Sequence, residues 1–175
     1  MKGSFGRFTN EYKIENIEEA AAIAARNASD QAAAARVCRA LVGRDNVALQ
    51  AELARTIPAI GAYELYDVVL EWFRESPNTK VRATAAISLS EHKVLKTPKH
   101  IIEELEYGDR GERAPLFAVA LSYFGRPEAI APLIRGLNTS FLEEKDEMHE
   151  LCASALTRID SDAAREALRK WYRRI

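Results

Sequence analysis

Apolar residues recur at steps of three and four along nearly the whole chain from Asn16 onward, the spacing of one face of an α-helix. Short polar breaks such as Ser29-Asp30 and Thr97-Pro98 interrupt the pattern, with residues that cap a helix or occupy its first turn. Because the breaks are only a few residues long, sequential helices are expected to be antiparallel neighbours. The pattern predicts ten helices, over residues 17–28, 30–42, 46–60, 63–75, 79–92, 98–107, 112–124, 127–137, 145–159 and 162–174.

Residues 1–15 lack this periodicity and mix glycines, phenylalanines and charged residues. We therefore expect a flexible tail over 1–15 and a single domain over 16–175, since a chain of 175 residues has the size of one domain. Alanine is abundant, whereas only 8 glycines and 6 prolines occur, which favours helix over strand. The predicted fold class is all-α.

A nine-residue frame of small and large apolar positions repeats along the chain. It is clearest over residues 81–89 and 148–156, and the matching frames start at 17, 49, 81, 113 and 148, which gives spacings of 32, 32, 32 and 35 residues. A period of this length is typical of helical repeats, in which pairs of helices stack and bury their apolar faces against one another. Ala86, Ala118 and Ala153 share one frame position and are expected to be buried by packing against the following repeat. An irregular helical bundle is the alternative.

One stretch, residues 120–137, reads Ala-Leu-Ser-Tyr-Phe-Gly, then the turn Arg-Pro, then Glu-Ala-Ile-Ala-Pro-Leu-Ile-Arg-Gly-Leu. It resembles the HEAT-like repeat of the phycobilisome-lyase type, in which an Ala-Leu pair, an apolar residue and Gly precede a turn and a second helix. Residues 155–163 echo the pattern, with Asp160 where the Gly would fall. The repeat predicts a right-handed α-solenoid of about five HEAT-like helix pairs, with the first helix of each pair outside and the second lining a concave groove.

Function is then expected on the exposed strip of the second helices. The strip is predicted to be acidic in the middle, smooth at Ala129, Pro132 and Gly136, and basic at the end. Residues 46–109 carry seven basic and ten acidic side chains, whereas residues 163–175 carry five basic and one acidic. A solvated charged surface is the alternative interpretation. The candidate partner-binding residues are Glu64, Asp67, Glu71, His100, Glu103, Tyr107, Glu166 and Lys170, with Tyr107 as the candidate anchor.

Motifs that carry catalytic or metal chemistry are missing from the sequence. The three histidines do not form an HExxH pattern, and the two cysteines, Cys38 and Cys152, are too far apart for a CxxC pair. No GxGxxG, GxxxxGKS or GxSxG motif occurs, so phosphate cradles and nucleophile elbows are not expected. We predict a non-enzymatic protein without metal or cofactor.

The overall composition indicates a globular protein, with 25 basic and 26 acidic side chains and 47% hydrophobic residues. This balance gives no support to capture of nucleic acid by a generally basic surface. No signal peptide or membrane-spanning run is visible, so a cytoplasmic location is expected.

The primary hypothesis is an adaptor, scaffold or inhibitor that holds another protein, possibly one with a basic surface, in the concave groove, as a monomer or in a heterocomplex. The resemblance implies an alternative, a subunit of a bilin lyase or isomerase. A toxin-immunity protein is a further alternative, and nucleic-acid binding is disfavoured by the acidic middle of the groove.

Overall fold

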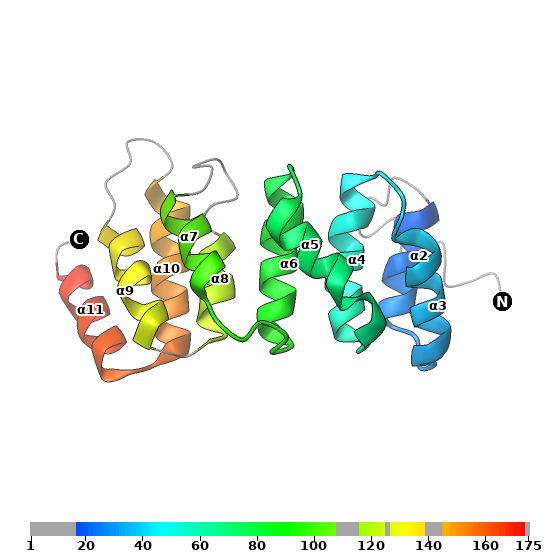
Figure 1. The fold of residues 1–175 in the computed structure, drawn as a ribbon. Coiled ribbons are helices and arrows are strands. Elements are labelled where there is room, and N and C mark those ends of the chain that lie inside the picture. The colour runs from blue at the N-terminus through cyan, green and yellow to red at the C-terminus, as the bar shows by residue number, and fades with distance from the viewer. Residues whose placement is uncertain (1–16, 108–115, 125–126, 139–144, 174–175) are drawn as a thin grey trace. The chain divides into compact units, whose positions relative to one another are not determined.

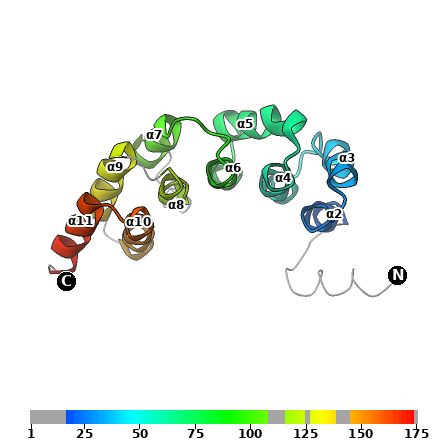
Figure 2. The same ribbon diagram turned by 90° about the horizontal axis from the view of Figure 1, so that it is seen from below.

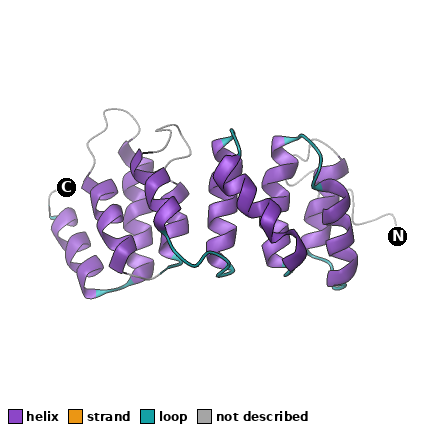
Figure 3. Ribbon diagram, in the orientation of Figure 1, coloured by secondary structure: helices purple, strands orange, loops and turns teal. Residues whose placement is uncertain are grey.

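The computed structural model describes residues 17–107, 116–124, 127–138 and 145–173. These residues form ten α-helices and one 3-10 turn, with no strand among them (Figure 3). The prediction of an all-α fold is confirmed. The elements are α2 (Ile17–Arg26), α3 (Gln31–Leu41), α4 (Val47–Ala59), η1 (Tyr63–Leu65), α5 (Tyr66–Glu75), α6 (Thr79–Glu91), α7 (Lys99–Tyr107), α8 (Leu116–Ser122), α9 (Pro127–Asn138), α10 (Lys145–Ile159) and α11 (Asp162–Tyr172).

Each helix predicted from the apolar spacing has a counterpart in the structure. Wherever an end lies in the described part of the chain, it falls within three residues of the prediction. The predicted start of helix 112–124 lies outside the described residues. The helix predicted over 63–75 begins instead as the 3-10 turn η1, which continues into α5.

Polar residues in the breaks or directly after them cap three of the helices. The side chain of Asp30 accepts a hydrogen bond from the backbone N–H of Ala33 (3.0 Å), and Asn46 accepts one from Leu49 (2.9 Å). Ser161 does the same for Ala164, at 3.2 Å. Such bonds satisfy backbone donors that the first turn of a helix leaves without an intrahelical partner, and so fix where α3, α4 and α11 begin.

The chain divides into two compact units, one up to Ala85 and one from Ala86, with the division inside α6. In the first unit α2 and α4 pack together in one layer, with α3 and α5 in the other (Figures 1 and 2). Leu53 and Ile57 of α4 are completely buried, and the Thr56 hydroxyl donates to the Ala22 carbonyl at 3.2 Å. This buried hydrogen bond ties α4 directly to α2.

The second unit repeats this layering. Helices α8 and α10 pack together in one layer, and α7, α9 and α11 form the other, in which α9 contacts both of its neighbours (Figure 2). Helix α10 also contacts α9 and α11. The core between the layers contains large apolar side chains that are almost entirely buried: Phe117, Leu121, Leu133, Leu137 and Leu156.

The alanines that share one position in the repeat frame are buried, as expected. Ala86 and Ala118 are fully buried, and Ala153 is 7% exposed. A small residue at this position lets neighbouring helices approach closely, and a larger or charged side chain would have to displace packed atoms.

Candidate functional site

The acidic candidates of the first unit lie on the solvent side of η1 and α5. Val69 and Phe73 face the core, and this leaves Asp67 and Glu71 exposed on the opposite side, one helical turn apart. Neither carboxylate forms an ion pair within the described part of the chain. We call Asp67 and Glu71 the α5 acidic pair.

Glu64 is exposed beside the α5 acidic pair, but its charge is compensated. Its Oε1 accepts a hydrogen bond from Nη2 of Arg39 on α3, at 2.7 Å. Sequence spacing could not reveal this contact, because the two residues are 25 positions apart and on different helices. Of the three acidic candidates in the first unit, Asp67 and Glu71 are therefore the two without an ion pair among the described residues.

Two tyrosines adjoin these acids, and sequence reasoning did not select them. The rings of Tyr63 and Tyr66 are 5.2 Å apart between centroids, and Tyr63 is 77% exposed. Burial, followed by the neighbouring Tyr63, raises the pKa of Tyr66 above its ordinary value. The sequence signal for a turn at this point was Gly61, two residues before Tyr63. Glycine readily adopts a positive φ, here +66°, at which the chain turns.

On α7, a histidine and a lysine lie close to the carboxylate of the acidic candidate Glu103. His100 Nδ1 lies 3.1 Å from Glu103 Oε2, and Lys99 Nζ lies 3.9 Å from Glu103 Oε1. All three residues are exposed. The described part of α7 therefore carries a mixed surface instead of a purely acidic one. Tyr107 is the last residue of α7, and its side chain lies outside the described part.

The expectation that Ala129, Pro132 and Gly136 form a smooth exposed strip is wrong. Ala129 and Pro132 are buried, and a Cβ added to Gly136 would lie 2.6 Å from Sγ of Cys152 on α10. These small residues belong to the packing side of α9, where they let α10 approach closely. The helical period was correctly predicted, but the exposed side was not.

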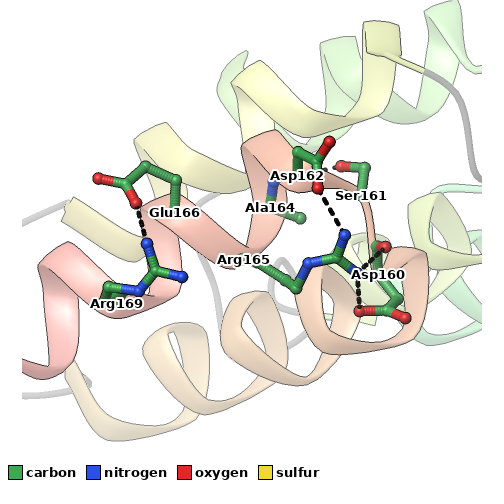
Figure 4. A network of polar contacts seen from close by, with 7 residues as sticks. All are labelled: Asp160, Ser161, Asp162, Ala164, Arg165, Glu166 and Arg169. Carbon is green, nitrogen blue, oxygen red and sulfur yellow. Dashed lines mark hydrogen bonds and ion pairs between the residues drawn. The ribbon is translucent and has the colours of Figure 1, made fainter.

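The basic helix α11 is largely compensated by acids of its own segment. Arg165 donates to Asp160 Oδ1 at 2.8 Å and to Asp162 Oδ1 at 2.6 Å, as Figure 4 shows. These hydrogen bonds, with that to Asp162 the largest cause, raise the pKa of Arg165. The candidate Glu166 pairs with Arg169 and, at 3.6 Å, with the candidate Lys170. The structure thus brings two candidates together as an ion pair.

Further aromatic contacts of the second unit were not predicted from the sequence. The ring of Trp171 lies 6.1 Å from that of His149 and 5.0 Å from that of Tyr172, which is 60% exposed. On the other layer, the guanidinium carbon of Arg158 on α10 lies 3.9 Å from the ring centroid of Tyr123, just after α8. The His149–Trp171 and Arg158–Tyr123 contacts join residues of different elements, so their spacing in the sequence gives no signal.

Both cysteines are buried and unsuited to thiolate chemistry at neutral pH. Burial raises the pKa of Cys38 to about 11 and that of Cys152 to about 12, so each thiol keeps its proton. Within the described ranges, no group of three His, Cys, Asp or Glu side chains is placed to hold a metal ion. None of the described helices has the length and apolar character needed to cross a membrane.

The candidate residues divide between the two units. Glu64, Asp67 and Glu71 belong to the first, and the others belong to α7 and α11 in one layer of the second, on either side of α9. Comparison of the chain with protein-family models and with curated proteins gives no match.

Proposed function

We propose that this chain is a HEAT-like α-solenoid that acts without catalysis, as an adaptor or inhibitor that binds another protein. The contacts between alternate helices support the solenoid arrangement: α2 packs on α4, α8 on α10, and α9 on both α7 and α11. Contacts between next-but-one helices are those expected of stacked pairs, in which each pair buries its apolar side against the next.

The observation that carries the binding function is the α5 acidic pair beside an exposed tyrosine. Asp67 and Glu71 present two exposed carboxylates that form no ion pair among the described residues, and Tyr63 adds a large exposed ring to the same segment. A basic protein surface complements such charges, which act mainly on encounter and orientation. Tyrosine supplies contact area together with a hydrogen-bonding tip.

The ion pairs of the cations on α11 favour a protein over a nucleic acid as the binding partner. Three of its cations, Arg165, Arg169 and Lys170, are paired with acids of the same segment. Binding to nucleic acid depends on many cations that are available to neutralise phosphates. The ion pairs on α11 reduce that supply.

The test begins with a photoreactive amino acid in place of Arg74, which is exposed on α5 near Glu71, to identify the partner by cross-linking in the native cell. The purified partner is then titrated against the variant Asp67→Lys/Glu71→Lys. We expect slower association and a dissociation constant raised by roughly tenfold or more, because attraction becomes repulsion. The matched control is Glu91→Lys, which reverses an exposed acid on α6. Equal losses in both variants, or no loss in either, would contradict the proposed binding surface.

A further inference from the structure

In the second unit, an exposed arginine stacks on an aromatic ring in the layer formed by α8 and α10. Arg158 lies with its guanidinium carbon 3.9 Å from the centroid of the Tyr123 ring. A guanidinium stacked in this way keeps its planar orientation, while its N–H groups stay available at the edge. We call these two residues the Arg158–Tyr123 pair.

The surroundings of Arg158 leave its charge without a carboxylate partner among the described residues. Its neighbour Arg165 takes the nearby acids Asp160 and Asp162. Among the residues of α10 whose side chains the structure describes, those exposed on the same side are Glu150, Ser154 and Thr157, and the Thr157 hydroxyl donates to the Ala153 carbonyl at 2.8 Å. Arg158 is therefore an oriented cation in a mostly neutral, hydroxyl-bearing surface.

Tyr123 belongs to an apolar stripe that runs along α8. Leu116, Val119 and Tyr123 are half-buried and recur at steps of three and four, whereas Phe117, Ala118, Ala120 and Leu121 are buried. The half-buried stripe and the oriented guanidinium offer adjoining apolar and cationic contacts. Arginine and tyrosine are also enriched among the residues that dominate binding energy at protein interfaces.

We propose that the Arg158–Tyr123 pair is the anchor of a protein-binding surface on the α8–α10 layer, and that it receives a carboxylate side chain flanked by apolar residues. The planar guanidinium can donate two parallel hydrogen bonds to a carboxylate. The ring of Tyr123 limits the orientations of Arg158, so less conformational entropy is lost on binding.

The charges around Arg158 favour a protein segment over a nucleic acid as the binding partner. A polyanion requires several cations along its path. In the described part of α10, the exposed side next to Arg158 instead presents Glu150 and two hydroxyl residues, so a single carboxylate fits this surface better than a run of phosphates. This surface is independent of the proposed α5 contact, since it belongs to the other unit and has the opposite charge.

The test uses the whole protein and a blocked peptide of sequence Gly-Leu-Glu-Glu-Leu-Gly, followed by nuclear magnetic resonance of the arginine Nε–Hε groups. We expect a saturable shift of the Arg158 resonance with this peptide and none with its glutamine counterpart. Arg158→Ala should raise the dissociation constant roughly tenfold. Arg158→Lys should recover part of the affinity, and Tyr123→Phe most of it, because the ring remains.

Two controls separate this surface from others. Arg74→Ala removes an exposed arginine in the first unit, and Asp67→Lys/Glu71→Lys disables the proposed α5 contact; both should leave the peptide affinity within twofold of the original protein. The inference is overturned if Arg158→Ala binds the peptide within twofold, or if the Arg158 resonance does not respond. It is also overturned if a short oligothymidylate binds Arg158 more tightly than the peptide does. Should Arg158→Ala fail to fold, the resonance of the original protein and the Tyr123→Phe variant decide the outcome.

Discussion

Gly136 shows how a single small residue determines the approach of two helices. A Cβ at this position would lie 2.6 Å from Cys152 Sγ, closer than packed atoms allow. In the sequence, glycine at this point of the pattern suits an exposed smooth surface as well as a close contact. Whether Gly136 is exposed or in close contact depends on Cys152, 16 residues further along the chain. For this reason the exposed side of α9 could not be predicted from the local spacing.

Gly136→Ala is expected to lower the free energy of unfolding. The steric cost of an added methyl in a packed site, about 1–3 kcal/mol, exceeds the gain of about 1 kcal/mol from the higher helix propensity of alanine. Urea denaturation of both forms measures the difference. In the double variant Gly136→Ala/Cys152→Ala the clash is absent, so the two substitutions should couple favourably. A Gly136→Ala variant at least as stable as the original protein would refute the close contact.

The two buried thiols predict a loss of stability in alkaline solution. Their folded-state pKa values, about 11 for Cys38 and about 12 for Cys152, lie above the ordinary value of 9.0. Above pH 9.0 the unfolded chain releases thiol protons that the folded protein retains, so the free energy of unfolding falls as the pH rises toward those values.

Urea denaturation at pH 8 and pH 10.5 measures this fall. A Cys38→Ala/Cys152→Ala variant is the control, and its stability should depend less on pH over the same interval. An equal dependence in both proteins would mean that the thiols do not carry the effect.

At the scale of the helix, positions where elements begin were predicted best, because they are determined by neighbours in the sequence. Asn46 and Ser161 each accept a backbone hydrogen bond from the first turn of the following helix. The charge balance of α7 and α11 could likewise have been predicted, since Lys99 with Glu103 and Glu166 with Lys170 stand four residues apart. The Arg39–Glu64 ion pair could not, because it depends on how η1 folds back toward α3.

The caps yield a prediction for each unit. Asn46→Ala and Ser161→Ala should each reduce the free energy of unfolding by about 1 kcal/mol, because a backbone N–H of α4 or α11 loses its acceptor. Chemical denaturation provides the measurement. Ser29→Ala is the control, since Ser29 is exposed and the cap of α3 is Asp30; this change should have little effect. A comparable loss in the control would argue against the assigned caps.

At the scale of the whole molecule, 25 basic side chains nearly balance 26 acidic ones, but individual charges differ in whether they are paired. Most charged candidates on α7 and α11 are compensated within their own helix, whereas the α5 acidic pair and Arg158 are not compensated by the described residues. Counting charges along the sequence predicted the acidic character of α5 and missed Arg158, because compensation depends on partners from other elements. The two proposed binding surfaces are built on the α5 acidic pair and on Arg158.

The central proposal is that helix pairs stack side by side, which in the second unit places α9 between α7 and α11. Spin labels at the exposed positions Glu103 on α7 and Arg169 on α11, in the Cys38→Ala/Cys152→Ala background, test it by electron paramagnetic resonance. Neighbouring helices pack about 8–10 Å apart, so the two steps from α7 through α9 to α11 predict a separation of roughly 16–20 Å between the helix axes. A dominant separation of about 10 Å would place α7 directly against α11 and contradict the stacking.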